Sequence, residues 1–349
     1  MARLRPTPIY SALKLFSFGL AAILPLAGSF LAWGDFSIKF PNTEFSIDGS
    51  FLSNSIPLWL QVFLAMISIL SFGLGTYVLV SHQKTQNRKR VLCIEHLDYP
   101  ASQTRGMLEN LPKDYQGLTN EFMLIDGRNK TPRERLQAVD RKMRDAKDRI
   151  SDGSDPNDYF PVYGGIAAVP MVVMAGFFWG NQNRIHLRDY DRSLGSWHDN
   201  GNVDDGVLID STELPKSSLN NPEAGLCLEF SMAMDQADMD LQFPGIPIFS
   251  IHYADGETGL DRLSSEHKQQ RLIREIVDYM NSLIKLFPNL AVLHLFITAQ
   301  SSFVFRVGQA LHQNHVPQVR IYHYDAKLPL GQRHAWSLEI AGTNAFNIL

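Results

Sequence analysis

The sequence predicts an α/β protein in which two transmembrane helices precede two fused Rossmann-like halves. Three observations support this prediction. Residues 1–83 hold two long apolar runs, which is typical of membrane spans. The remaining residues alternate short β-branched runs with longer helical patterns, which indicates parallel sheets covered by helices. That second region also repeats itself at a fixed offset.

The two predicted membrane spans are residues 12–33 and residues 58–80. The first contains one charged residue, Lys14, whose side chain can reach the interface, and the second contains none. Lys and Arg flank the outer ends of both spans and the connecting segment is acidic, so both termini are expected in the cytoplasm. A cleaved signal peptide is the alternative for the first span, because small residues follow Pro25. In either case the chain from about residue 84 onward is expected to be cytosolic.

Two further segments are assigned to ordinary structure. Residues 36–51 alternate apolar and polar positions around Asn42 and Gly49, which is typical of a small hairpin. Residues 162–179 are apolar, but they contain Pro170 and several glycines and lack a consistent basic flank. We therefore expect a buried strand, a turn and a helix there rather than a third span.

The composition excludes several functional classes. The chain of 349 residues has 32 Lys plus Arg against 36 Asp plus Glu, so it is not an overall basic nucleic-acid binder, and no direct DNA or RNA partner is expected. Its only cysteines, Cys93 and Cys227, exclude a disulfide scaffold and a cysteine-based zinc site and indicate a reducing compartment. Common catalytic and nucleotide-binding motifs do not occur, so we expect no catalytic residue, no metal and no cofactor.

Two sequence matches at one offset indicate a duplication. The segment around Cys93 aligns with the segment around Cys227, an offset of 134 positions (227 minus 93). Residues 185–191 align with residues 319–325 at the same offset. Two matches at one spacing, each on a segment that reads as a strand, favour a repeated fold over coincidence.

Each half is predicted to hold strands that alternate with two helices. The first half, residues 84–218, includes a helix announced by a capping box at Thr131 and Glu134. Its elements are strands at 91–96, 121–125, 159–163 and 184–190 and helices at 132–150 and 167–179. The second half is residues 219–349. Its elements are strands at 225–230, 246–253, 291–298, 319–324 and 335–340 and helices at 265–287 and 301–313.

Ligands of such sheets bind at the carboxyl ends of the strands, where both halves carry small or polar residues. Gly164 and Gly165 follow one strand and precede a helix, where close backbone approach and free amides suit a phosphate. A bulky residue in place of Gly164 is therefore expected to block a ligand without harming the fold. The equivalent turn of the second half carries Thr298, Gln300 and Ser301, which could bind a ligand or cap the helix.

Further candidate ligand contacts are aromatic rings that can stack on bases, cations that can meet phosphates and polar groups at strand ends. They are Tyr163, His96, Arg192, Ser231, Phe303 and Arg306. Packing or solvated surface is the alternative for such residues. His294 is interpreted as a core histidine. Asp235, Asp238 and Asp240 are interpreted as part of a loop packed by methionines rather than as a metal site.

Several of these segments resemble SAVED domains. The central signature is matched by residues 163–170, Gly176, residues 186–192 and Trp197, and the last block by residues 294–298, Gly308 and residues 320–324. The resemblance covers roughly residues 90–349. The chain departs from it at Gln300 and Ser301, where the second half of many such domains has a proline near the turn, and this bears on base preference more than on fold.

The resemblance implies two fused CARF-like halves that bind a cyclic oligonucleotide made by a CD-NTase in bacterial antiphage signalling (CBASS). Such domains assemble on ligand binding and switch on an attached effector. Here the attached part is two transmembrane helices. We therefore expect a cyclic tri- or tetranucleotide in the groove between the halves, self-assembly into homo-oligomers, and disruption of inner-membrane lipid that causes abortive infection.

Two alternatives belong to other functional classes. One is a membrane-anchored enzyme of CARF type that degrades a cyclic nucleotide, with His96, His252 or His323 as the base or metal ligand. The other is a structural membrane adaptor. The absence of a catalytic motif favours the sensor over the enzyme.

Overall fold

The computed structural model describes residues 36–39, 46–49, 58–100, 106–109, 111–112, 115–152, 155–181, 184–313, 317–341 and 345–349. The chain divides into two compact units, Met1–Arg88 and Lys89–Leu349. The first predicted span, residues 12–33, lies outside the described residues.

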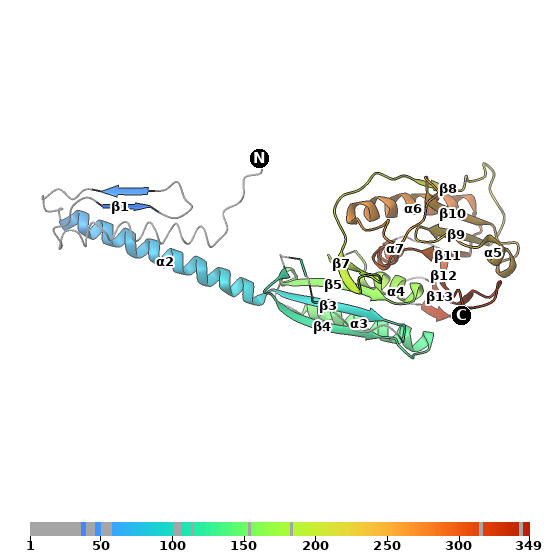
Figure 1. The fold of residues 1–349 in the computed structure, drawn as a ribbon, viewed down its shortest axis with the longest axis horizontal. Coiled ribbons are helices and arrows are strands. Elements are labelled where there is room, and N and C mark those ends of the chain that lie inside the picture. The colour runs from blue at the N-terminus through green and yellow to red at the C-terminus, as the bar shows by residue number, and fades with distance from the viewer. Residues whose placement is uncertain are drawn as a thin grey trace. The chain divides into compact units, whose positions relative to one another are not determined.

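A short hairpin and one long helix are described in the first unit (Figure 1). β1 (Phe36–Lys39) pairs antiparallel with β2 (Ser46–Gly49), which confirms the predicted hairpin. α2 (Leu58–Arg88) is 31 residues long and contains residues 58–80, whose assignment as a membrane span stays a prediction. Its apolar side chains include Trp59, Ile69 and Leu70, which are 70% to 72% exposed. Counting only the residues that the structure describes, no helix combines the length and apolar character that crossing a membrane requires.

The first half of the second unit is a five-stranded sheet with strand order β4-β3-β5-β6-β7. β4, β3, β5 and β6 are parallel, and β7 closes one edge antiparallel. The elements are β3 (Arg90–Leu97), β4 (Thr119–Asp126), α3 (Pro132–Ser151), β5 (Tyr159–Ile166), α4 (Val169–Trp179), β6 (His186–Asp191) and β7 (Ser196–Asp199), with a 3₁₀ turn at Pro156–Asp158. α3 begins with the predicted capping box of Thr131 and Glu134. The apolar run at 162–179 is a strand and a helix, as predicted.

The second half is a seven-stranded sheet with strand order β14-β13-β12-β11-β9-β10-β8. Its four central strands, β10, β9, β11 and β12, are parallel, and the others are antiparallel. The elements are β8 (Ile209–Ser211), β9 (Glu223–Glu229), α5 (Gln236–Gln242), β10 (Ile248–Tyr253), α6 (Glu266–Leu286), β11 (Val292–Thr298), α7 (Ser301–Gln313), β12 (Gln318–Tyr324), β13 (His334–Ala341) and β14 (Ala345–Ile348). The predicted loop at Asp235–Asp240 is wrong: α5 lies there, because the side chain of Asp235 caps it by accepting from the Ala237 N–H.

The two sheets repeat one topology, which confirms the predicted pair of Rossmann-like halves. β4-β3-β5-β6-β7 of the first sheet corresponds to β10-β9-β11-β12-β13 of the second. The strand register keeps the offset found in the sequence. Cys93 lies opposite Val162 and Cys227 lies opposite Phe296, again 134 positions apart (296 minus 162). Both cysteines are buried.

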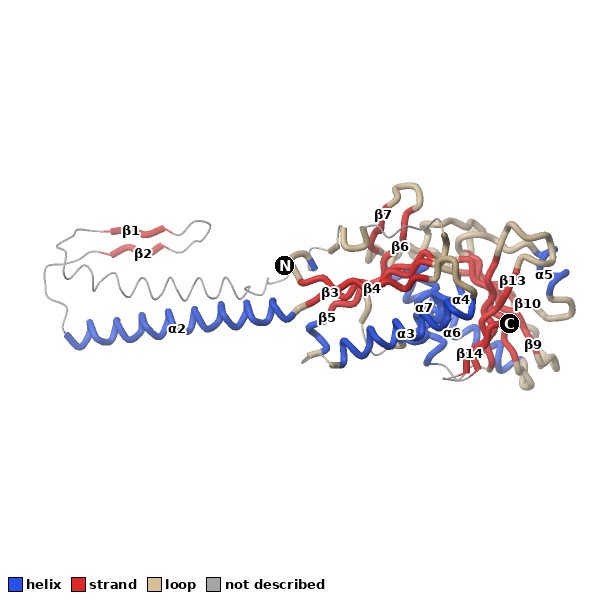
Figure 2. The backbone as a smooth tube through the Cα atoms, turned by 90° about the horizontal axis from the view of Figure 1, so that it is seen from below, coloured by secondary structure: helices blue, strands red, loops and turns tan. Residues whose placement is uncertain are grey.

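The halves join through α4 and α7, which Figure 2 shows side by side where the two sheets meet. Their backbones touch at two glycines. A Cβ on Gly176 would lie 2.8 Å from the carbonyl carbon of Phe305 and closer still to its oxygen. A Cβ on Gly308 would overlap the carbonyl oxygen of Val173 in the same way. The two helices therefore need glycine at this crossing, and one apolar core runs through both halves.

Candidate functional site

A cavity of about 520 Å³ opens between the two halves at the carboxyl ends of their strands. The first half contributes residues 165–167, at the end of β5 and just beyond it, and residues 189–193 at the end of β6. Gly164 and Gly165 lie within β5, so the prediction that they follow the strand is wrong. The second half contributes residues 231–232, 297–301 and 323–324. The volume suits a small-molecule ligand, and strand ends of this kind are where α/β sheets bind ligands.

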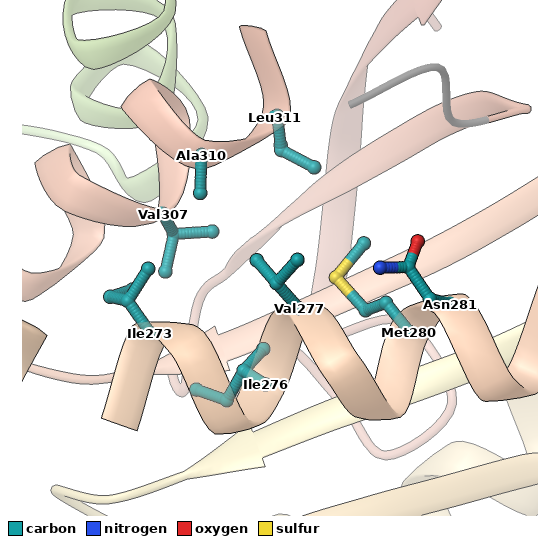
Figure 3. A pocket seen from close by; sticks show the side chains of 8 residues that line it. All are labelled: Ile273, Ile276, Val277, Met280, Asn281, Val307, Ala310 and Leu311. Carbon is teal, nitrogen blue, oxygen red and sulfur yellow. The ribbon is translucent and has the colours of Figure 1, made fainter. Parts of the chain in front are cut away.

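A second hollow lies between α6 and α7 (Figure 3). The side chains of Ile273, Val277 and Met280 on α6 face those of Val307 and Leu311 on α7. Its free space is about 10 Å³, which is room for roughly one water molecule. A third cavity, of about 690 Å³, lies away from the strand ends, beside α3 and β14. The cavity between the halves is the candidate ligand site because it alone of the three lies at the strand ends of both sheets.

The structure brings six of the eleven predicted ligand residues together at this cavity. They are Gly165, Arg192, Ser231, Thr298, Gln300 and Ser301. The other five lie elsewhere. They are His96, Tyr163, Gly164, Phe303 and Arg306.

His96 and Tyr163 belong to a buried chain of polar groups. His96 Nδ1 lies 2.9 Å from the Tyr163 hydroxyl, and His96 Nε2 lies 3.3 Å from Asp98 Oδ1. Asp98 Oδ2 accepts from the Ala168 N–H at 3.0 Å, at the start of α4. Burial raises the pKa of Tyr163 well above its ordinary value. Burial also opposes ionisation of Asp98, but His96, the Ala168 N–H and the charge of Arg135 together lower the pKa of that carboxyl. These side chains contact one another and the amide at the start of α4. They therefore position α4 and do not line the cavity.

Gly164, Phe303 and Arg306 also have structural roles. A Cβ on Gly164 would lie 2.5 Å from the indole of Trp197, so the expectation that a bulky residue there leaves the fold intact is wrong. Phe303 is fully buried. Arg306 donates to the side-chain oxygen of Gln269 on α6 at 2.9 Å.

Buried aspartates already occupy the helix N-termini that face the cavity. Asp189, from β6 of the first half, accepts from the N–H of Ser302 at 2.9 Å and from its hydroxyl at 2.5 Å, at the start of α7 in the second half. Burial raises the pKa of Asp189. Asp98 holds an amide of α4 in the same way. Neither aspartate was predicted from the sequence, which assigned the amides before α4 to a phosphate and left the turn before α7 open between a ligand and a cap. An acidic residue at a strand end is nevertheless a signal for such a cap.

Three polar side-chain atoms at the cavity have no hydrogen-bond partner in the described part of the chain. They are Ser231 Oγ, Gln300 Oε1 and Ser301 Oγ. Thr298 differs, because its hydroxyl donates to the Met232 carbonyl at 2.5 Å. A buried polar atom without a partner costs about 1–3 kcal/mol. Each of the three atoms has less than 1 Å² of accessible surface, so in this structure they are buried within the cavity wall rather than exposed to a ligand.

The rest of the cavity wall supplies aromatic rings and mixed charge. Tyr99, Tyr190 and Tyr324 line it, and the Tyr190 ring packs edge-on against Trp197 at 5.3 Å. Arg192 is the one Arg or Lys among the described lining residues. Such a wall can stack on bases and offers one cation to a phosphate.

The remaining candidates for chemistry have other partners. His294 is 3% exposed and its Nδ1 lies 2.8 Å from the Tyr322 hydroxyl, which confirms a core histidine. Among the described residues, no group of three His, Cys, Asp or Glu could hold a metal ion. Of the three histidines considered for an enzyme, His323 lines the cavity, and burial lowers its pKa.

Two family models match the chain. The SAVED model, described as the SMODS-associated and fused to various effectors sensor domain, matches residues 137–340. The Saf_2TM model, described as the SAVED-fused 2TM effector domain, matches residues 7–141. The chain therefore belongs to the SAVED family, and its N-terminal region matches the 2TM effector domain that is fused to SAVED. This second match indicates association with a membrane.

Solved structures of SAVED receptors are similar to this chain. One is the Acinetobacter baumannii Cap4 SAVED/CARF-domain containing receptor with the cyclic trinucleotide 2′3′3′-cAAA, at 16% identity and a TM-score of 0.50. The same receptor with 3′3′3′-cAAA gives 16% identity and 0.49, and the Moraxella osloensis Cap4 receptor gives 15% and 0.44. Each comparison covers 82% of this chain but only 60% of the receptor. The first likeness supports the fold. A comparison with curated proteins found no match.

Proposed function

We propose that this protein is a membrane-associated sensor and effector that binds a cyclic oligonucleotide, a tri- or tetranucleotide, between the two halves of its SAVED domain. The observation that carries the proposal is the cavity of about 520 Å³ at the strand ends of both sheets, with three unpaired polar atoms in its wall. The Acinetobacter baumannii receptor, of the same family, was solved with a cyclic trinucleotide.

A ring-shaped ligand suits a cavity whose walls come from both halves. Tyr99 and Tyr190 of the first half and Tyr324 of the second line the cavity, and we expect them to stack on bases, with Arg192 meeting a phosphate. A ligand that contacts both walls favours the arrangement of the halves that fits it best. Binding then shifts the population toward that arrangement, which self-assembles into homo-oligomers.

The output of the sensor is membrane disruption. The chain matches the 2TM effector model, and α2 exposes large apolar side chains along its length. Such side chains are stable in lipid rather than in water. Both termini and the SAVED domain lie in the cytoplasm of a bacterial cell, and the protein spans the inner membrane. Assembly concentrates the membrane helices, and the resulting damage causes abortive infection. The ligand is the product of a CD-NTase.

The test of binding is isothermal titration of the full chain in detergent micelles against cyclic di-, tri- and tetranucleotides, with light scattering on the same samples. We expect selective binding of one ring and growth in particle size. Binding of none of them would overturn the proposal. Growth without a ligand would overturn ligand-controlled assembly.

A second experiment addresses the effector and the competing enzyme. The full chain is reconstituted in vesicles loaded with a dye, and the selected ring is added. We expect dye release together with full recovery of intact ligand. Steady consumption of the ligand would instead identify a CARF-type degrading enzyme, and binding without dye release would leave a sensor whose output is not membrane damage.

A further inference from the structure

We infer that two copies of this chain pair through the outer edge of β4, in an antiparallel two-fold arrangement centred on Phe122. The dimer goes beyond the proposed function, because it forms with or without a ligand and ligand-driven growth adds to it. The inference comes from a comparison of the two halves. A strand that is covered in the second half has a counterpart in the first half that no described strand covers.

β4 is a long edge strand without the features by which proteins protect an edge. It ends the first sheet (Figure 1) and is eight residues long, whereas the other edge strands of the two sheets, β7, β8 and β14, have four, three and four. Its residues, Thr119–Asp126, include no Pro and no Lys, and it pairs with β3 without a bulge. Proteins ordinarily blunt an edge by such means, because its unpaired N–H and C=O groups bind other strands.

The second half shows what covers the equivalent edge. In β10, Ser250 lies opposite Cys227 of β9. In β4, Phe122 lies opposite Cys93 of β3, so Phe122 is the counterpart of Ser250. β8 pairs antiparallel with β10, and beside it the Ser250 carbonyl accepts from the Thr212 N–H while the Ser250 N–H donates to the Thr212 hydroxyl, both at 2.9 Å. By this correspondence the backbone N–H and C=O of Phe122 point to the outer edge of β4.

The repeat explains why the first half lacks this cover. β8 belongs to the segment that links the two halves, and this segment is fastened to α6 by ion pairs such as that of Asp204 with Arg271, at 2.7 Å. Moved back by the offset of 134 positions, β8 falls at residues 75–77. Those residues belong to α2. The chain ahead of β3 therefore cannot supply a covering strand as the linking segment does.

A second copy of β4 is the partner that suits this edge. The acidic side chains of the strand already have cations in their own chain. Glu121 lies 2.6 Å from Arg90. Asp126 lies 2.8 Å from Arg128. The edge thus selects no charged partner, but the Phe122 ring is 47% exposed at its middle, and a two-fold axis there sets two phenyl rings opposite each other, which is a favourable cross-strand pair.

The charges also favour this register. When the two-fold axis passes through Phe122, Glu121 lies opposite the partner's Met123. A shifted register that sets Glu121 opposite the partner's Asp126 brings like charges together, which is destabilising. Residues that lie opposite each other in antiparallel strands have Cα atoms about 4.5–5.5 Å apart, so cysteines at position 122 of the two copies can form a disulfide.

The first experiment measures the mass of the full chain in detergent micelles, without a ligand, by light scattering. We expect the wild-type chain to be a dimer. Phe122→Lys removes the aromatic pair and sets two cations face to face, so the dissociation constant of the dimer should rise at least about tenfold. Leu208→Lys is the matched control, because Leu208 is 66% exposed just before β8. It should keep the dimer.

The second experiment tests the register by cross-linking. Cys93 and Cys227 are both buried, so an introduced surface thiol is the one that reacts. Mild oxidation should link Phe122→Cys chains into dimers on a denaturing gel and leave Asp210→Cys, at an exposed position of the edge strand β8, monomeric.

Three results would overturn the inference and leave the proposed binding of a ligand standing. They are a monomeric wild-type chain, an unchanged dissociation constant in Phe122→Lys, and equal cross-linking of the two cysteine variants. Binding of no cyclic oligonucleotide would instead overturn the proposed function and leave the dimer, because the dimer is measured without a ligand.

Discussion

The contact between α4 and α7 gives the sharpest prediction about how the halves are joined. Gly176→Ala places a methyl group where the backbone carbonyl of Phe305 lies, and no side chain can rotate away to make room. The helices must therefore separate. Overpacking of this kind costs about 1–3 kcal/mol, and it outweighs the gain of up to about 1 kcal/mol that alanine brings to a helix. We expect a net loss of about 1–2 kcal/mol in the free energy of unfolding.

Thermal unfolding of the purified chain, followed by tryptophan fluorescence, measures this loss. A net loss of about 1–2 kcal/mol corresponds to a Tm lower by roughly 2–8 °C for a domain of this size. Because one separation of the helices relieves both overlaps, the double variant with Gly308→Ala should lose less than the sum of the single losses. Gly201→Ala is the control, since the nearest atom to a Cβ there is 3.6 Å away. Equal Tm values for Gly176→Ala and the control Gly201→Ala would refute the reasoning.

Three further predictions concern single side chains. Asp189→Ala leaves amide and hydroxyl donors of α7 unpaired, so the free energy of unfolding in denaturant should fall by about 1–3 kcal/mol; no change would mean that water replaces the carboxylate. Gly164→Val should lower the Tm and shift the fluorescence of Trp197, and a variant with native Tm would contradict the packing described. The hydrogen bond from Arg271 lowers the pKa of Asp204 from 3.8 to about 2. The Asp204–Arg271 pair therefore stabilises the folded chain fully at pH values above 3.8, and this stabilisation is lost as the pH falls from 3.8 through about 2. The difference in Tm between wild type and Asp204→Asn should close over the same pH range. A Tm difference that persists at lower pH would contradict this role of the Asp204–Arg271 pair.

Local patterns were sufficient to predict most of the fold. The capping box of Thr131 and Glu134 and the two cysteine-bearing strands depend on neighbouring residues, and all were located from sequence. The repeated offset then gave the order of elements. α5 was missed because its seven residues are too short to show a helical period.

The site was only partly predictable, because its chemistry depends on distant pairs. A sequence shows that Gln300 and Ser301 follow a strand, but not that Asp189, more than a hundred residues away, satisfies α7 and leaves them free. Likewise His96 lies at a strand end as expected, yet its contact with Tyr163 removes it from the cavity. The sequence therefore located the strand ends, but it did not show which polar atoms at those ends lack a hydrogen-bond partner.

The central claim is that a cyclic oligonucleotide binds in the cavity between the halves. The most direct test titrates the ring selected by the wild-type chain into Ala299→Trp, whose indole would fill the cavity that Ala299 lines. Ala254→Trp, at an exposed turn outside the cavity, is the control. The account predicts that Ala299→Trp, still folded by its cooperative thermal transition, loses binding while the control keeps it. Equal affinity in both variants and the wild type would contradict the account.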